Sequence, residues 1–207
     1  MGKKIATFLT WCFHPLFIPT YGMGVLYLIF TGPFFLHDYR IPVLLLSITF
    51  ITTGLLPALS AWILLRSGIL KNLQMDDRRE RLLPYLTTAL YYLMAYYMFR
   101  SFPLPLVLLK IFRHFILAGC IGILLTTVIN FFWKISAHTV AAGGWCGALT
   151  GLCLLMYDPP LPALFAVIGI AGVTGYARLK LEAHTPAQVY AGYLLGFACT
   201  FFLLNRV

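Results

Sequence analysis

Long apolar stretches alternate with short polar segments along the whole chain. A helix needs about 20 apolar residues to cross the hydrocarbon core of a bilayer. Stretches of about this length lie at residues 8–30, 41–65, 82–99, 114–133, 139–157, 161–177 and 187–204. The pattern predicts an all-α fold, a polytopic transmembrane helical bundle of about seven spans, with six as the alternative count.

Prolines and charges modify two of these elements. Pro15 and Pro19 interrupt the first stretch, so we expect the first span to be kinked. Lys110 and Arg113 add charge to residues 104–113. We therefore expect that segment to lie in the membrane interface, ahead of the fourth span.

Composition supports a lipid environment. Of the 207 residues, 61% are hydrophobic and 10% are charged, whereas a soluble domain has roughly a quarter charged residues. There is too little polar surface to cover a globule in water. We interpret residues 1–207 as a single membrane domain, a multi-pass protein of a cell membrane, and we expect the bacterial inner membrane.

The chain is basic, with 15 Lys and Arg against 6 Asp and Glu and a net charge of +9. The basic residues lie between apolar runs, and no polar segment interleaves them with aromatic residues. The charge therefore indicates contact with lipid headgroups or an anionic substrate, and not a nucleic-acid partner.

Alternation of the spans places most of the informative polar residues on one membrane face. Residues 66–81, 134–138 and 178–185 fall on that face with the N-terminus, and the C-terminus falls on the other. The loop charges assign no orientation relative to the cytoplasm, because many of the cations on the first face are candidates for binding an anionic substrate.

Three segments of that face contain groups suited to phosphoryl chemistry, at residues 71–81, 134–138 and 178–188. Phosphoryl transfer requires positive groups around the equatorial oxygens, a nucleophile in line, and an acid at the leaving oxygen. Arg and Lys supply the first, and two histidines can supply the others. Ser136 and Thr185 are suitable N-caps for the helices that follow them.

These segments resemble the motifs of the type 2 phosphatidic acid phosphatase superfamily, a family of membrane lipid phosphatases. The family pattern is K-x-x-x-x-x-x-R-P, then P-S-G-H, then S-R-x-x-x-x-x-H-x-x-x-D. The chain matches it, in order, at Lys71 and Arg78, at Ser136 and His138, and at Arg178 and His184. The motif-bearing core would cover residues 67–204.

The resemblance implies a role for each matched residue. His184 would attack phosphorus and form a phosphohistidine, and His138 would protonate the departing lipid oxygen. Arg178, Lys71 and Arg78 would hold the phosphate oxygens, assisted by Lys134 and the Ser136 hydroxyl, with Arg81 as an alternative ligand. The family needs no metal or other cofactor, and the sequence shows no metal-ligand cluster. The substrate would be a lipid phosphate: a polyprenyl diphosphate, a phosphatidic acid or a phosphatidylglycerol phosphate.

The chain departs from the pattern at five positions: Arg79, Ile135, Ala137, Ala177 and Gln188. Gln188 stands where the family has its Asp, and it has two competing roles. Its carbonyl could orient His184 by accepting a hydrogen bond from one ring nitrogen. Alternatively, Thr185 and Gln188 could form a capping box at the start of the last helix. One carbonyl would have to serve both roles, and we favour the orienting one.

Two other functions remain as alternatives at the level of sequence. A phosphotransferase would pass the phosphoryl group to a second lipid alcohol. A non-catalytic member would bind or translocate a phospholipid. The sequence does not indicate an oligomeric state.

Some candidate residues have ordinary structural explanations. His14, His37 and His114 match no motif and are interpreted as structural, and Arg79 as part of a solvated loop. The glycines at positions 143, 144, 147 and 151 are expected to permit close helix packing.

Overall fold

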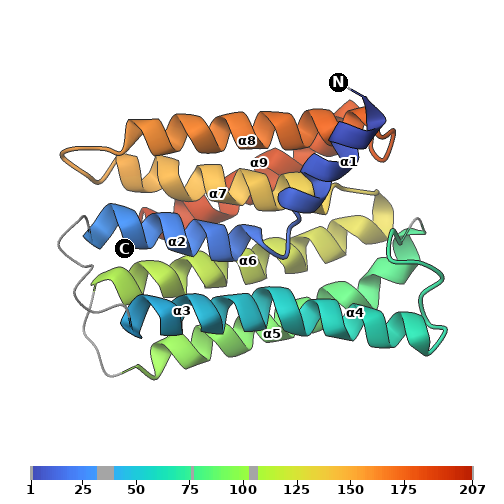
Figure 1. Ribbon diagram of the computed structural model, residues 1–207, viewed down its shortest axis with the longest axis horizontal. Coiled ribbons are helices and arrows are strands. Elements are labelled where there is room, and N and C mark those ends of the chain that lie inside the picture. Colours follow the sequence, from blue (N-terminus) through green and yellow to red (C-terminus); the bar gives the residue numbers. More distant parts are fainter. Residues whose placement is uncertain (1, 32–39, 76, 103–106, 207) are drawn as a thin grey trace.

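The computed structural model describes residues 2–31, 40–75, 77–102 and 107–206, and in these ranges it is helical, without strands. Most helices lie side by side along one long axis, while α1 runs obliquely across one end of the bundle (Figure 1). The elements, in chain order, are α1 (Lys3–Cys12), α2 (Ile18–Thr31), α3 (Arg40–Phe50), the π-helical turn η2 (Ile51–Leu55), α4 (Leu56–Arg66), the 3₁₀ turn η3 (Arg78–Arg81), α5 (Leu82–Arg100), α6 (Val107–Phe132), α7 (Ala137–Cys153), α8 (Leu161–Lys180) and α9 (Pro186–Leu204).

The prediction of a helical membrane bundle is confirmed. Four helical segments of the described residues are long and apolar enough to cross a bilayer: Arg40–Arg66, Val107–Phe132, Leu161–Lys180 and Pro186–Leu204. The first of these combines α3, η2 and α4 into one continuous helical run. α5 and α7 lie alongside these segments in the same bundle (Figure 1).

The first predicted span is two helices and not one kinked helix. α1 ends at Cys12, α2 begins at Ile18, and residues 13–17 connect them. Pro15 has no amide hydrogen to donate to the carbonyl of Trp11, which lies four residues before it. The Trp11 carbonyl instead accepts from the His14 amide at 3.3 Å, and the helix ends there.

The fourth span also differs from its prediction. α6 begins at Val107 and runs without interruption to Phe132. Lys110 and Arg113 therefore belong to the first turns of a membrane-crossing helix and not to a separate interfacial segment. Residues 104–106 of the predicted segment lie outside the described residues.

α7 is the most enclosed helix of the bundle and packs chiefly against α9. Its run from Ala142 to Leu149 is buried without interruption. A Cβ atom added at Gly143 would overlap the backbone of Tyr193, and one added at Gly147 would overlap that of Phe197. The two backbones therefore touch, which confirms the close packing expected of these glycines.

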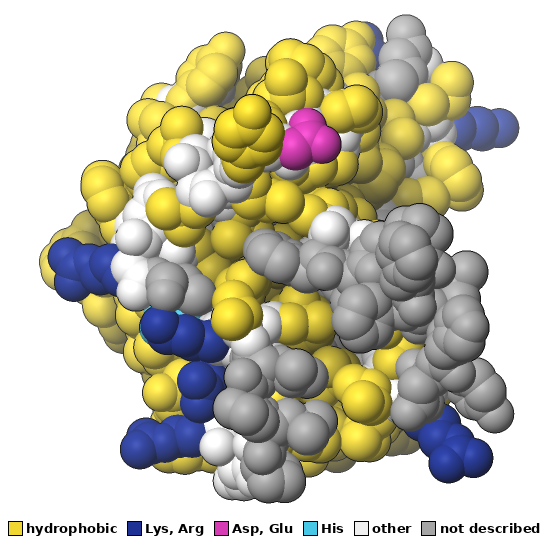
Figure 2. Space-filling model, turned by 90° about the vertical axis from the view of Figure 1, so that its left-hand side faces the viewer, with side chains coloured by type: hydrophobic (Ala, Val, Ile, Leu, Met, Phe, Trp, Pro, Cys, Tyr) yellow, Lys and Arg dark blue, Asp and Glu magenta, His cyan; other side chains and the backbone are white. Residues whose placement is uncertain are grey.

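The two ends of the bundle differ. The segments around residues 67–81, 134–138 and 181–185 lie at one end with the N-terminus, at the right of Figure 1. The opposite end faces the viewer in Figure 2, where Lys and Arg side chains gather along one side. Arg100, at the end of α5, belongs to that opposite end.

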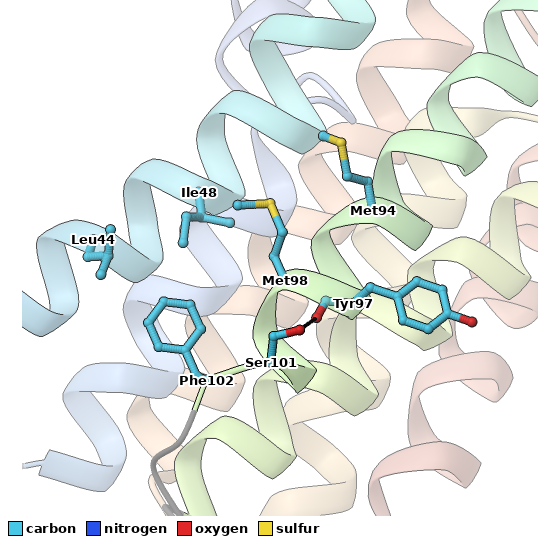
Figure 3. Close-up of a pocket in the computed structure, with 7 residues that line it drawn as sticks. All are labelled: Leu44, Ile48, Met94, Tyr97, Met98, Ser101 and Phe102. Atoms are coloured by element: carbon cyan, nitrogen blue, oxygen red, sulfur yellow. Dashed lines mark hydrogen bonds between the residues drawn. The ribbon is translucent and has the colours of Figure 1, made fainter.

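A hollow of about 820 Å³ opens between α3 and α5 near the same opposite end (Figure 3). Its lining is apolar apart from Ser101, whose hydroxyl donates to the carbonyl of Tyr97 at 3.0 Å. The other residues that line it are Leu44, Ile48, Met94, Met98 and Phe102. Since the phosphoryl-type motifs lie at the other end of the bundle, this hollow is separate from them.

Candidate active site

Folding brings parts of all three motif segments together at one end of the bundle. His184 lies in the short connection between α8 and α9, His138 in the first turn of α7, and Arg178 in the last turn of α8. Arg178 and His184 both act electrostatically on the His138 ring. The common face predicted from alternation therefore corresponds to a cluster of side chains.

Gln188 fixes the tautomer of His184. Its Oε1 lies 3.1 Å from His184 Nδ1 and accepts a hydrogen bond from the Thr185 amide at 3.2 Å. A backbone amide only donates, so the Gln188 atom that faces it is the oxygen. The same oxygen can pair with His184 only if Nδ1 bears the proton. In neutral His184 the free lone pair is therefore on Nε2.

The capping box predicted for α9 is also present. The Thr185 hydroxyl accepts from the Gln188 amide at 3.5 Å, while Gln188 Oε1 accepts from the Thr185 amide. The expectation that the two roles of Gln188 compete is therefore wrong. A carbonyl oxygen has two lone pairs, and here one serves the helix cap and the other serves His184.

Three cations surround His184, which is itself 9% exposed. Burial lowers the pKa of His184 to about 4, the hydrogen bond with Gln188 opposes the shift, and Arg178, Arg81 and Lys134 lower the pKa further. His184 is therefore neutral at pH 7, in a positive environment suited to a phosphate group.

Arg81 and Arg178 form the buried part of this positive environment. Arg81 is 7% exposed, and its Nε donates to the carbonyl of Met75 at 2.8 Å. The Arg178 Nε is buried with no hydrogen-bond partner among the described residues. Tyr85 interacts with both guanidinium groups. Because the Nε of Arg81 donates to Met75, an anion would be held by the terminal nitrogens of its guanidinium group.

His138 and Ser136 occupy the N-terminus of α7. Ser136 is fully buried, and its hydroxyl accepts from the Thr139 amide at 3.5 Å, which confirms its role as an N-cap. The His138 Nε2 is buried and has no hydrogen-bond partner within the described ranges. An unpaired buried ring nitrogen beside Arg178 and two other histidines, His14 and His184, is a site for substrate contact.

Lys71 and Arg78, the first motif by spacing, lie apart from this cluster. The Lys71 side chain is 82% exposed, and its Nζ lies 4.0 Å from Glu80 Oε1. The Arg78 Nη1 donates to the carbonyl of Phe132 at 2.7 Å, and the Arg78 carbonyl accepts from Asn130 Nδ2 at 2.7 Å. Arg78 therefore joins η3 to α6, and Arg81 is the cation of this segment that reaches His184.

One histidine that we interpreted as structural lies in the cluster. The ring centroids of His14 and His138 are 5.1 Å apart, with an interplanar angle of 82°. His14 follows α1, outside all three motif segments, so no spacing pattern could have identified it. His114 pairs with the carbonyl of Lys110 at 2.7 Å, as expected of a structural residue. His37 lies outside the described residues.

Comparison with known proteins locates the family signature in the C-terminal part of the chain. The family model described as the PAP2 superfamily matches residues 127–207. Over these residues the chain is similar to the PAP2 superfamily. The match includes His138, Arg178 and His184, three members of the cluster. No curated protein and no solved structure shows significant similarity to the chain.

Similarity to the PAP2 superfamily indicates, at a coarse level, a phosphatase-type enzyme of a membrane, a hydrolase of phosphoric esters. The matched residues form the C-terminal end of α6, all of α7 to α9 and the connections between them. Residues 67–81, which contain Arg81, and α1, which leads to His14, precede the region of PAP2 similarity.

Proposed function

We propose that this protein hydrolyses a phosphate monoester or diphosphate attached to a lipid, at the membrane surface, through a phosphohistidine intermediate. One observation supports this most directly. His184 has its Nδ1 proton held by Gln188, its Nε2 lone pair free, and three cations around it. That is the arrangement of an activated nucleophile facing an anion.

In the first half of the reaction, the Nε2 lone pair of His184 attacks phosphorus and the bond from phosphorus to the lipid oxygen breaks. His138 donates its proton to that oxygen, and the lipid alcohol, or the lipid monophosphate from a diphosphate, departs. The negative phosphate offsets the charges of Arg178 and Arg81, so bound substrate stabilises a protonated His138.

In the second half, a water molecule attacks the phosphohistidine and the phosphorus–nitrogen bond breaks. His138, now neutral, accepts the proton from the attacking water. Inorganic phosphate leaves, and both histidines return to their starting protonation states. Arg178, Arg81 and Lys134 stabilise the transferring phosphoryl group in both halves, and the mechanism requires no metal ion.

Phosphate release from a panel of lipid phosphates tests this function. The purified protein, in detergent, would be given a polyprenyl diphosphate, a phosphatidic acid and a phosphatidylglycerol phosphate, with and without a chelator. We expect phosphate release from at least one lipid, insensitivity to the chelator, and inhibition by vanadate, which mimics five-coordinate phosphorus. Release only in the presence of an acceptor alcohol would indicate a phosphotransferase, and binding without turnover would indicate a non-catalytic protein.

Gln188→Ala should reduce both turnover and stability. The substitution removes the acceptor that orients His184 and the acceptor that caps α9. We expect turnover to fall severalfold and the free energy of unfolding to fall by about 1 kcal/mol. Steady-state kinetics and thermal melting of the same preparation would measure the two effects. Gln188→Glu is the matched control, because it keeps an acceptor oxygen for both partners. A lowered melting temperature with wild-type turnover would show that Gln188 acts only as a helix cap.

The acid limb of the pH–rate profile should lie well below the ordinary histidine range. Burial lowers the pKa of His184 from 6.5 to about 4, so the nucleophile of the free enzyme stays neutral as the pH falls from 7 to 5. The nucleophile is lost only as the pH falls through the lowered pKa. Gln188 raises this pKa, so Gln188→Ala should move the limb to still lower pH. The profile of kcat/KM, with circular dichroism at each pH as the control for folding, measures this. A wild-type limb near pH 6.5 would contradict the assignment.

A further inference from the structure

His14 contacts the imidazole that the proposed mechanism uses as its acid. Its ring lies edge-on to His138, with centroids 5.1 Å apart and planes at 82°. Arg178 acts electrostatically on both rings. His14 comes from the connection between α1 and α2, whereas His138 begins α7, so two distant parts of the chain meet at this contact.

The His14 ring is held in one orientation. Its Nδ1 accepts a hydrogen bond from the Leu16 amide at 3.3 Å, so Nδ1 bears no proton and neutral His14 is protonated on Nε2. Trp11 stacks against the ring, with centroids 6.1 Å apart, and Phe17 meets it at 6.3 Å. Contacts on several sides therefore determine which edge of the His14 ring faces His138.

α1 brings His14 to the site and makes further contacts there. It packs against α8, whose last turn contains Arg178 and which is followed by the connection that contains His184. Its Lys3 pairs with Glu182 at 3.5 Å, beside His184, and the backbone of Thr10 interacts with the His138 ring. Both side chains of the ion pair are exposed, so that pair alone adds little stability. The contacts to His138 are the ones that bear on chemistry.

We propose that His14 is a positioning residue for His138. It packs against the His138 ring and holds it in the orientation in which Nε2 faces the leaving oxygen of the substrate. The His138 Nε2 has no hydrogen-bond partner in the part of the chain that the structure describes. The ring orientation therefore depends on contacts away from Nε2, from His14 and the Thr10 backbone. This inference rests on the proposed function.

Two substitutions separate this role from a role in the local turn. Asn at position 14 can accept from the amide two residues later through its side-chain oxygen, as in an Asx-turn, but it has no ring. Phe keeps a ring of similar size against His138 but cannot accept that hydrogen bond. A residue needed only for the turn would tolerate His14→Asn and not His14→Phe, whereas a residue that positions His138 would show the opposite order.

The test compares the kinetics of both variants on the best lipid phosphate of the panel. We expect His14→Asn to lower kcat about tenfold, because a misplaced acid slows the chemical step. KM should stay within about twofold, since the groups that bind phosphate are unchanged. His14→Phe should keep most of the wild-type kcat. His114→Asn, at the opposite end of the bundle, is the matched control and should be unchanged. Wild-type kcat in His14→Asn, or equal losses in both variants, would overturn the proposal.

A second measurement does not depend on activity. Diethyl pyrocarbonate modifies neutral imidazole nitrogens, and mass spectrometry of peptides reports the rate at each histidine. His138 should react severalfold faster in His14→Asn than in the wild type or in His14→Phe. An unchanged rate in His14→Asn would overturn the positioning role even if the wild type hydrolyses no lipid phosphate. Failure of the wild type in the phosphate-release panel would overturn the proposed function instead.

Discussion

His184→Ala should lower phosphate release by roughly a thousandfold or more, since removal of a nucleophile leaves only the catalysis due to binding and electrostatics. The fold should persist, because His184 lies in a connection between helices and its only recorded hydrogen-bond partner among the described residues is Gln188. Phosphate release in detergent and the melting temperature are the two measurements.

Two controls define how His184→Ala is interpreted. His114→Ala, a histidine substitution at the opposite end of the bundle, should leave turnover unchanged. Rapid-quench labelling with a lipid that contains ³²P should trap an acid-labile phosphoprotein in the wild type and not in His184→Ala. Phosphate release from His184→Ala at the wild-type rate would refute the phosphohistidine mechanism.

Arg81→Ala should reduce turnover by about a hundredfold, whereas Lys71→Ala should change it less than about twofold. Arg81 is buried and acts electrostatically on both Arg178 and His184, while the Lys71 side chain is 82% exposed and faces Glu80. Both substitutions remove one positive charge from the same segment. The comparison therefore separates position in the cluster from overall charge.

Loss of Arg81 also leaves the Met75 carbonyl without its donor, so a destabilised variant has to be distinguished from an inactive one. Arg81→Lys keeps the charge but cannot supply two separate hydrogen-bonding edges. We expect Arg81→Lys to retain more activity than Arg81→Ala and to have a melting temperature similar to that of Arg81→Ala. A larger loss of turnover from Lys71→Ala than from Arg81→Ala would contradict this assignment. It would indicate that the residues that match the motif spacing bind the phosphate.

The helices were predictable because lipid imposes a simple rule, in which every span needs a long apolar run. The same rule could not locate the break at residues 13–17, because the segments on both sides of the break are apolar and Pro15 is the only proline between them. The start of α6 at Val107 was also missed. Lys110 and Arg113 lower the local hydropathy there, yet long side chains of this kind can reach the interface from within a helix.

In the candidate site, local chemistry was predicted better than distant contacts. Ser136 and Thr185 cap their helices as expected, because capping depends on residues three positions apart. Motif spacing favoured Lys71 and Arg78 over Arg81, but spacing does not report which side chain of a short turn faces inward. His14 follows no motif, and only its contact with His138 in the folded chain reveals it.

The direct backbone contact of α7 with α9 has a consequence for how the protein admits a substrate. His138 begins α7 and His184 precedes α9, and a Cβ atom at Gly143 or Gly196 would overlap the opposing backbone. The spacing between the two histidines is therefore set by main chain, which is the least compressible part of a helix pair. On the proposed function, a lipid headgroup that needs more room would displace α1 or the segment at residues 67–75 and 77–81. On the proposed mechanism, chains that differ in those two segments could therefore differ in substrate size while the separation of the acid and the nucleophile stays constant.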